Sequence, residues 1–181
     1  MSQDRLEETY TDDEIRAILS SVKRIAMVGA SNNAARPSYF VLKYLASRGY
    51  EMLPVNPGLA GGAILGLPVY RDLRAVAGPI DMVDIFRNSD AAGGIVDEAL
   101  TLDPLPKVIW MQLSVFNAAA AAKARGAGLT VIMNRCPKIE YGRLSGEISW
   151  AGVNSGVLSS RRPVIGSGVQ RLDLAAKPGG A

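Results

Sequence analysis

The chain has 181 residues, of which 48% are hydrophobic and 20% are charged, and its formal net charge is +3. This size and composition are typical of one globular domain, and the absence of a Lys/Arg-rich run argues against a nucleic-acid-binding protein. The chain has no histidine, which excludes nucleophilic triads that use it and, with a single cysteine, argues against a zinc site.

The lone cysteine, Cys136, also rules out an intrachain disulfide and favours a reducing compartment. The first residues, MSQDRLEETYTDDEIRAIL, are acidic and polar and lack the basic-then-apolar order of a secretory signal. No apolar stretch approaches the roughly 20 residues that a membrane span needs. We therefore predict a cytoplasmic protein that contacts neither membranes nor nucleic acid.

The predicted elements alternate between helices and short apolar strands. Thr11 is expected to cap a helix over residues 12–20, and later helices are expected from Pro37 to Gly49, after a cap at Asp90, and from a cap at Asn117 through Arg125. Strands are expected at residues 24–29, 51–57, 81–86, 107–113 and 129–134, joined after the second by a glycine-rich connection with a small helical turn at residues 58–70.

The strands read as continuous apolar runs rather than as alternating apolar and polar positions. Such runs, separated by helices, are typical of a parallel sheet covered by helices on both faces. Pro54, inside the second run, favours an irregular or edge strand. The predicted fold class is α/β, a doubly wound, Rossmann-like parallel sheet in a single domain.

The stretch VGASNNAARPSYF, which follows the first strand, is typical of a phosphate-binding loop. Gly29, Ala30 and Ser31 are small and permit close backbone approach, and the helix starting near Pro37 offers N–H groups and a positive dipole end. Arg36 can make a forked contact with a phosphate, and Ser38 can donate a further hydrogen bond. The alternative is a tight strand-to-helix turn with a solvated surface arginine.

Two features argue against a nicotinamide or flavin dinucleotide in this loop. The spacing G-x-G-x-x-G is absent after Gly29, and the second strand ends in Pro54-Val55-Asn56-Pro57 without the acidic residue that grips a ribose. Glu51 lies at the other end of that strand. Asn56 can still hydrogen-bond a ribose or base edge, so we predict a nucleotide diphosphate that is recognised differently from a dinucleotide.

Five sequence blocks in order, GASNNAARPSYFVLKYLASRGY, LPVNPGLAGGAILGLPVY, DMVDIFRNSD, VIWMQLSV and MNRCPKIEYGRL, resemble the stand-alone CoA-binding protein family. That family is similar to the N-terminal CoA-binding domain of the succinyl-CoA synthetase alpha subunit. The resemblance covers residues 24–144 and implies that CoA lies across the strand ends. That subunit depends on a phosphohistidine, and this chain has no histidine, so the resemblance implies binding rather than ligase chemistry.

The resemblance also implies roles for individual residues. The pyrophosphate region of CoA would contact Gly29, Ala30, Ser31, Arg36 and Ser38; the adenosine would be bordered by Asn56 and Pro57, with Phe86 and Arg87 beside it; and the pantetheine end would face Gln112 and the turn Asn134-Arg135-Cys136. The chain departs from its relatives in the loop after Asn56-Pro57, where they often carry a lysine and this chain has Gly58-Leu59-Ala60-Gly61.

The residues themselves leave alternatives for several of these positions. Phe86 and Arg87 suit a stacking ring and a phosphate cation, or a core ring and a surface charge. Gln112 suits a ligand amide or a solvated strand end. Asp84, in an apolar strand, is expected to bond backbone groups of the adjacent loop, and Trp110 to pack in the core.

Cys136 has three interpretations. Arg135 and Lys138 favour a thiolate there, which would act as a nucleophile or form a mixed disulfide with CoA. The third interpretation is a semi-buried residue in a tight turn. No histidine is available to activate the thiol.

We therefore expect an N-terminal helical segment at residues 1–22, a CoA-binding Rossmann-like domain at 23–144 and an arm with a flexible end at 145–181. The expected function is binding of CoA or an acyl-CoA without catalysis. The alternatives are a nicotinamide-dependent oxidoreductase, a thiol-dependent acyl-CoA enzyme using Cys136, and a subunit of a complex. In the arm, Trp150 would anchor a partner subunit or a second copy of the chain, or pack on its own domain.

Overall fold

The computed structural model describes residues 8–146, and these form an α/β domain around a five-stranded parallel sheet with strand order β2-β1-β5-β6-β7. The sheet strands are β1 (Arg24–Val28), β2 (Glu51–Val55), β5 (Met82–Ile85), β6 (Val108–Met111) and β7 (Thr130–Ile132). Each coincides with one of the apolar runs identified in the sequence, so the expected fold class is confirmed. The predicted arm around Trp150 lies outside the described residues.

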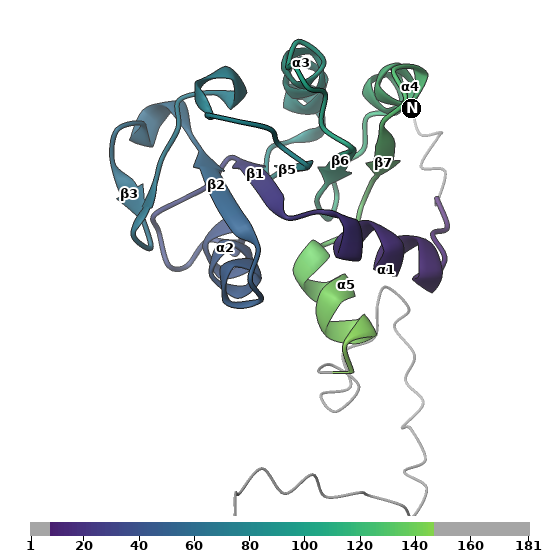
Figure 1. Cartoon of the computed structure of the whole chain (residues 1–181), viewed down its shortest axis with the longest axis horizontal. Helices are drawn as coiled ribbons and strands as arrows, with labels where there is room; N and C mark the ends of the chain where they lie inside the picture. The colour runs from purple at the N-terminus through teal and green to yellow at the C-terminus, as the bar shows by residue number, and fades with distance from the viewer. Residues whose placement is uncertain (1–7, 147–181) are drawn as a thin grey trace, which may run out of the picture.

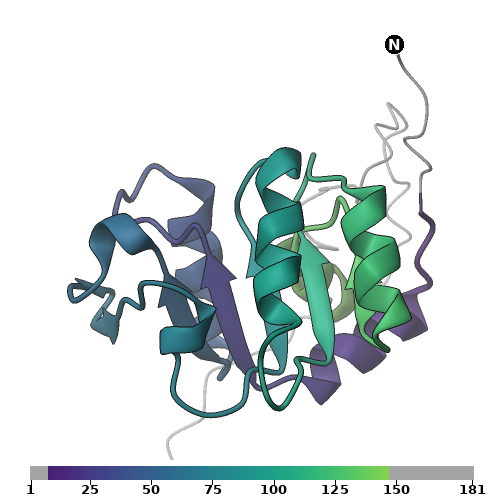
Figure 2. The same ribbon diagram turned by 90° about the horizontal axis from the view of Figure 1, so that it is seen from above.

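Helices cover both faces of the sheet (Figure 1). The five helices are α1 (Asp12–Ser21), α2 (Pro37–Ser47), α3 (Ser89–Ala99), α4 (Ala118–Gly126) and α5 (Pro137–Leu144). Helices α3 and α4 lie side by side on one face, as Figure 2 shows, whereas α1, α2 and α5 lie on the other. None of these helices is long and apolar enough to span a bilayer, a finding that covers residues 8–146.

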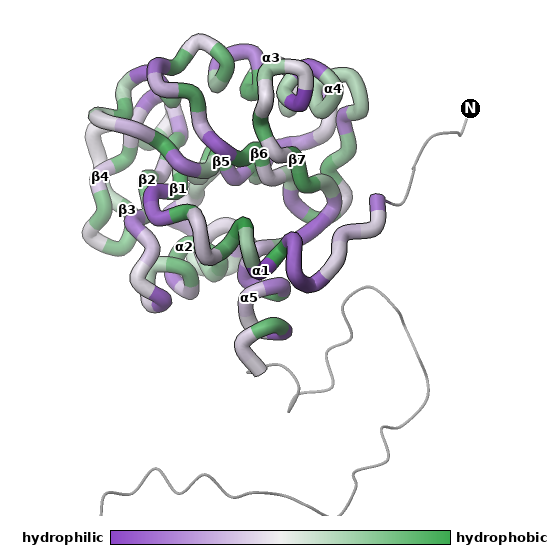
Figure 3. Tube along the Cα trace, turned by 45° about the vertical axis from the view of Figure 1, so that its right-hand side comes forward, coloured by the Kyte–Doolittle hydropathy of each residue, from purple (hydrophilic) through white to green (hydrophobic). Residues whose placement is uncertain are grey.

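The strands are apolar on both faces because each face is buried under helices. In β1, Ile25 and Met27 pack with the cluster under α1, α2 and α5, whereas Ala26 packs with the cluster under α3 and α4. Figure 3 shows the hydrophobic residues concentrated along the central strands. Trp110 of β6 is fully buried, as expected, and its Nε1 donates to the Arg135 carbonyl at 2.8 Å.

The first helix begins as the sequence predicts. The Thr11 hydroxyl accepts from the Glu14 N–H, and the Glu14 carboxylate accepts from the Thr11 N–H at 2.8 Å. This reciprocal capping satisfies two backbone donors at the start of α1. Because Ile15 and Leu19 of α1 are buried, the helix packs onto the α2/α5 face of the sheet rather than standing apart from the domain.

Two other helix predictions need correction. Helix α3 is capped by Asn88, whose side chain accepts from the Ala91 N–H, so Asp90 lies within the first turn instead of capping it. Helix α5 was not expected at all. It has only eight residues and begins at Pro137, so its apolar periodicity is too short to stand out from a turn.

The glycine-rich connection after β2 contains the expected small helical turn, at Pro57–Leu59, and also a short antiparallel pair of strands, β3 (Ala63–Ile64) and β4 (Leu67–Pro68). Beyond it lies a second short helical turn at Leu73–Ala75. Strand β2 is at the edge of the sheet, which explains how it accommodates Pro54. The Pro54 carbonyl accepts from the Tyr70 N–H at 2.9 Å, so the chain after β4 covers that edge.

Candidate functional site

The strand order places a topological switch point between β1 and β5. The chain leaves β1 into α2 on one face and leaves β5 into α3 on the other, so the two connections diverge from adjacent strand ends (Figure 1). Ligands of open α/β sheets bind in the crevice at such a point. At this point Gly29, which follows β1, lies against Phe86, which follows β5.

Gly29 is required by the packing of these two strand ends. Its φ of +92° favours glycine, and a Cβ at this position would lie 2.4 Å from the Phe86 carbonyl oxygen and 3.0 Å from Cδ of Arg87. The sequence predicts that a bound phosphate closely approaches the backbone at Gly29. In the structure the closely approaching group is the protein's own backbone, which brings the Arg87 stem over the loop.

Asn56 links the loops that follow β1 and β2. Its Nδ2 donates to the Ala30 carbonyl at 2.7 Å, and its Oδ1 accepts from the Gly58 N–H at 2.9 Å. Ala30 itself is fully buried, whereas Ser31 accepts from the Asn33 N–H through its hydroxyl at 3.1 Å. The Asn56 side chain is therefore committed to backbone groups. Its predicted contact with an adenosine, and that of the exposed Pro57, stay predictions.

The start of α2 offers fewer backbone donors than expected. Pro37 has no N–H, and the Tyr39 N–H donates to the Arg36 carbonyl at 3.0 Å. Arg36 is exposed at the helix N-cap and its side chain makes no capping bond, while Ser38 is buried. The freely presented group at this end of the loop is therefore the Arg36 guanidinium, which suits a phosphate oxygen.

A cavity of about 530 Å³ lies between the start of α2, the ends of β5 and β6, and the start of α5. It contains four of the residues predicted for the site, Phe86, Arg87, Gln112 and Cys136. The full lining is Ala35, Pro37, Phe40, Val41, Phe86, Arg87, Gln112, Leu113, Val115, Cys136, Lys138 and Ile139. Such a lining, apolar with few polar groups, is typical of small-molecule sites.

Several of the lining residues were not identified from the sequence as site residues. Phe40 of α2 is 52% exposed and lines the cavity. Leu113 is exposed to the same extent. For Phe40, the available signal was its place in the first turn of the helix that begins at Pro37, next to the predicted phosphate-binding loop. Lys138 was considered only for its effect on Cys136, yet it lines the cavity.

Arg135 is absent from this lining. Its guanidinium carbon lies 5.6 Å from the Tyr10 ring centroid, and its Nε lies 3.8 Å from a Glu140 carboxylate oxygen. These contacts hold the side chain against α1 and α5. The Asn134 side chain likewise bonds to the protein's own backbone, since its Oδ1 accepts from the Ser114 N–H at 2.8 Å. The predicted contact of Arg135 with the pantetheine end therefore has no support from the geometry.

Cys136 is 6% exposed, and burial raises the pKa of its thiol. The negative charge of Asp84 acts in the same direction, whereas the Ile139 and Lys138 N–H groups and the charge of Lys138 lower the pKa without cancelling the effect of burial. Lys138 therefore favours the thiolate as expected, but burial dominates and the pKa of the thiol is raised overall. The semi-buried interpretation of Cys136 describes the structure, with the addition that the residue lines the cavity and precedes α5 as its N-cap.

Asp84 is the most buried charged residue of this region, with no exposed surface. Its Oδ1 accepts from Gln112 Nε2 at 2.8 Å, and its Oδ2 has no hydrogen-bond partner. Burial raises the pKa of this carboxyl to about 7. The sequence predicts that Asp84 bonds backbone groups of the adjacent loop. The observed partner is instead the side chain of Gln112, which lines the cavity.

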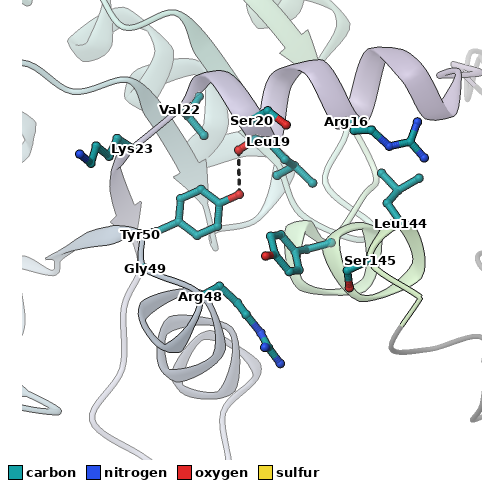
Figure 4. A pocket seen from close by; sticks show the side chains of 11 residues that line it. Arg16, Leu19, Ser20, Val22, Lys23, Arg48, Gly49, Tyr50, Leu144 and Ser145 are labelled. Carbon is teal, nitrogen blue, oxygen red and sulfur yellow. Dashed lines mark hydrogen bonds between the residues drawn. The ribbon is translucent and has the colours of Figure 1, made fainter. Parts of the chain in front are cut away.

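A second cavity, of about 460 Å³, lies at the opposite ends of the strands, between α1, the end of α2 and α5. Figure 4 shows Tyr50 beside it, with the hydroxyl donating to the Leu19 carbonyl at 2.8 Å, and Arg16 and Arg48 at its border. None of the predicted site residues lines it. Among residues 8–146, moreover, no group of acidic, cysteine or histidine side chains is arranged to hold a metal ion.

Comparison with known proteins matches most of the chain to one family. The profile of a family described as the CoA binding domain matches residues 23–142. The protein YneT of Bacillus subtilis (strain 168) is 38% identical over 128 residues, which are 71% of this chain and 92% of YneT.

Solved structures share the fold. Prb, described as the PH1109 protein redesigned for binding, has 37% identity and a TM-score of 0.72, covering 77% of this chain and 95% of its own. A protein from Pyrococcus horikoshii OT3 has 36% identity and a TM-score of 0.72, covering 81% of this chain and 100% of its own. The family profile, the relative and the shared fold together show that this chain belongs to the family of small CoA-binding domain proteins.

Proposed function

We propose that the protein binds CoA or an acyl-CoA at the switch point and has no catalytic activity of its own. The observation that carries this proposal is the cavity that joins the loop ends at Phe86 and Arg87 to Gln112 and Cys136. CoA has a charged nucleotide end and a long, weakly polar pantetheine arm. A crevice with exposed arginines that continues into an apolar cavity is complementary to both parts.

The polar end of the ligand would lie against the loop after β1. The exposed Arg36 and Arg87 flank this loop and would contact the phosphates, with Gly29, Ala30 and Ser31 forming the backbone surface beneath them. Asn56 and Pro57 would border the adenosine. The pantetheine arm would then enter the cavity between Phe40 and Leu113, whose exposed rings and methyl groups it would cover.

The alternatives have less support. A nicotinamide dinucleotide needs a ribose-binding carboxylate after β2, and the residue there, Asn56, uses both ends of its amide on the backbone. A thiol-dependent enzyme needs an activated cysteine, whereas burial raises the pKa of the Cys136 thiol. The single cysteine also supports a reducing, cytoplasmic location.

Calorimetric titration of the full chain with CoA and, separately, with NAD tests the proposal. Under reducing conditions we expect saturable binding of one CoA per chain and no binding of NAD. Incubation with acetyl-CoA, followed by chromatography, is expected to return the thioester intact. Binding of NAD without CoA would support the oxidoreductase instead, and turnover of the thioester would show catalysis.

A further inference from the structure

The pair formed by Asp84 and Gln112 lies where the cavity meets the sheet. Asp84 is opposite Met27 of β1 and Trp110 of β6 in the strand register, so its side chain is on the face that α2 and α5 cover. Gln112 follows β6 and lines the cavity while being only 6% exposed. Burying a carboxyl group this completely costs free energy of folding, and a buried carboxyl oxygen without a hydrogen-bond partner calls for an explanation.

The hydrogen bond between the two side chains determines which end of the Gln112 amide is engaged. An amide has a donor end and an acceptor end, and here the nitrogen donates to Asp84 Oδ1. The carbonyl oxygen is then the acceptor of Gln112 that remains for a molecule in the cavity. Asp84 Oδ2, buried and without a partner, is the only such buried side-chain atom among residues 8–146.

We propose that Gln112 contacts the ligand directly, by accepting a hydrogen bond from the cysteamine end of the pantetheine arm, and that Asp84 is a positioning residue that turns the Gln112 carbonyl into the cavity. This inference rests on the proposed binding of CoA. It assigns the inner end of the cavity to a hydrogen-bond donor, either the terminal amide N–H or the thiol S–H of CoA.

The arrangement couples binding to protonation. An ionised Asp84 accepts only, so the Gln112 nitrogen faces it and the carbonyl faces the cavity. A protonated Asp84 can donate to the Gln112 carbonyl, which allows the amide to turn over. Because burial raises the pKa of Asp84 to about 7, the favourable orientation predominates above neutral pH and is lost below it.

Other titratable groups lie near Asp84 and Gln112. Comparing wild type with an Asp84 variant separates their effect on the pH dependence of binding from that of Asp84. On the elements around Asp84, β1 and β6 contribute Met27 and Trp110 as neighbours. The titratable or charged side chains on the other elements are Tyr39, Lys43 and Tyr44 of α2, Arg87 after β5, and Cys136, Lys138, Glu140, Tyr141 and Arg143 at α5. Glu140 is already paired with Arg143 at 2.7 Å. Of these groups, Cys136 is coupled to Asp84, whose negative charge raises the pKa of the thiol. The phosphates of CoA are common to the measurements on wild type and on an Asp84 variant.

The experiment measures the dissociation constants of CoA and desulfo-CoA by calorimetry at about pH 6 and about pH 8.5. We expect Gln112→Leu to weaken CoA binding about tenfold at the higher pH, the loss of one hydrogen bond. Asp84→Asn is expected to weaken it several-fold at the higher pH and to match wild type at the lower pH. The matched control is Asp81→Asn, on the same strand run but at its amino end, where Lys23 and Arg24 N–H groups and Lys107 contact the carboxylate.

Desulfo-CoA identifies the donor. If the thiol donates, desulfo-CoA binds wild type more weakly than CoA does and Gln112→Leu abolishes the difference; if the amide donates, both ligands lose affinity equally in Gln112→Leu. Equal CoA affinity in wild type and folded Gln112→Leu would overturn the inference, as would a wild-type pH profile in Asp84→Asn. Failure of wild type to bind CoA at either pH would instead overturn the proposed function, and the inference with it.

Discussion

The Phe86 carbonyl oxygen approaches Gly29 so closely that a Cβ on residue 29 would lie 2.4 Å from it. Gly29→Ala must therefore separate the ends of β1 and β5, and it must also hold alanine at a φ of +92°. We expect the free energy of unfolding to fall by more than about 2 kcal/mol, as measured by urea denaturation.

Gly94→Ala is the matched control. Gly94 lies within α3, is exposed, and a Cβ there would meet no atom within 4 Å. Alanine is the better helix former, so this substitution should stabilise the protein by about 0.5–1 kcal/mol. A Gly29→Ala variant as stable as wild type would show that the two strand ends are not held in contact.

Asn56 is expected to preorganise the site through its two hydrogen bonds, to Ala30 and Gly58. Asn56→Ala removes both and should lower the free energy of unfolding by about 1–3 kcal/mol, while also weakening CoA binding. Asn56→Asp keeps the acceptor for the Gly58 N–H but places a carboxylate oxygen against the Ala30 carbonyl. Chemical denaturation should therefore find Asn56→Asp destabilised as well, and a wild-type stability would contradict the assigned hydrogen bond.

Arg36→Ala separates ligand binding from folding. The side chain is exposed and does not cap α2, so stability should change by no more than about 0.5 kcal/mol. Loss of a charge-assisted contact with a phosphate should weaken CoA binding by roughly tenfold to a hundredfold. Calorimetry measures this, with Lys107→Ala as the control that removes a positive charge at the amino end of β6. Unchanged CoA affinity would remove Arg36 from the site.

Asp84 should make the protein less stable as the pH rises. Its folded-state pKa, about 7, is above the ordinary value of 3.8, so the folded state binds more protons than the unfolded state between these values. Stability from this group is complete below about pH 4 and is lost progressively up to pH 7. Asp84→Asn should therefore change the free energy of unfolding more favourably at pH 8 than at pH 4. The difference between the two pH values should be on the order of 2–4 kcal/mol.

Thermal unfolding scans at the two pH values measure this difference. Asp81→Asn again serves as the control, because surrounding backbone N–H groups and Lys107 lower the pKa of Asp81, so its loss should be felt more at pH 8 than at pH 4. Opposite signs for the two variants are the expected result. If Asp84→Asn changed the stability with pH in the same direction as Asp81→Asn, that result would contradict a raised pKa at Asp84.

Cys136 is expected to react slowly. The thiol is 6% exposed and burial raises its pKa, so alkylation by iodoacetamide at neutral pH should be at least about tenfold slower than in the urea-unfolded chain. Mass spectrometry of the alkylated chain over time gives both rates, and bound CoA should slow the folded rate further. Faster reaction in the folded protein would revive the thiol-dependent enzyme as an alternative.

The fold was predictable because its strands are buried on both faces. Continuous apolar runs such as residues 24–29 carry enough signal to identify a covered parallel sheet, and Pro54 correctly indicated an edge strand. Helix α5 was missed because eight residues after a proline show too little periodicity. The cap of α3 was misplaced because Asn88 and Asp90 are equally good capping residues, and only the backbone distinguishes them.

The sequence suggests a position for the candidate site, but not the residues that line its cavity. The loop after the first strand is where any such sheet binds its ligand, so Gly29 and Arg36 could be named from topology and chemistry. Side-chain directions depend on tertiary packing, which is why the sequence could not show that Phe40 lines the cavity and that Arg135 packs near Tyr10 instead. The pairing of Asp84 with Gln112 spans 28 residues and joins two strands whose adjacency the sequence does not state.

Native mass spectrometry of the full chain, mixed with equal amounts of CoA and NAD in the presence of a reductant, shows directly which of the two ligands the protein binds. Binding at the switch point predicts one added mass equal to that of CoA, which persists under reduction because the association is non-covalent, and no NAD adduct. A spectrum with an NAD adduct and no CoA adduct would contradict the account.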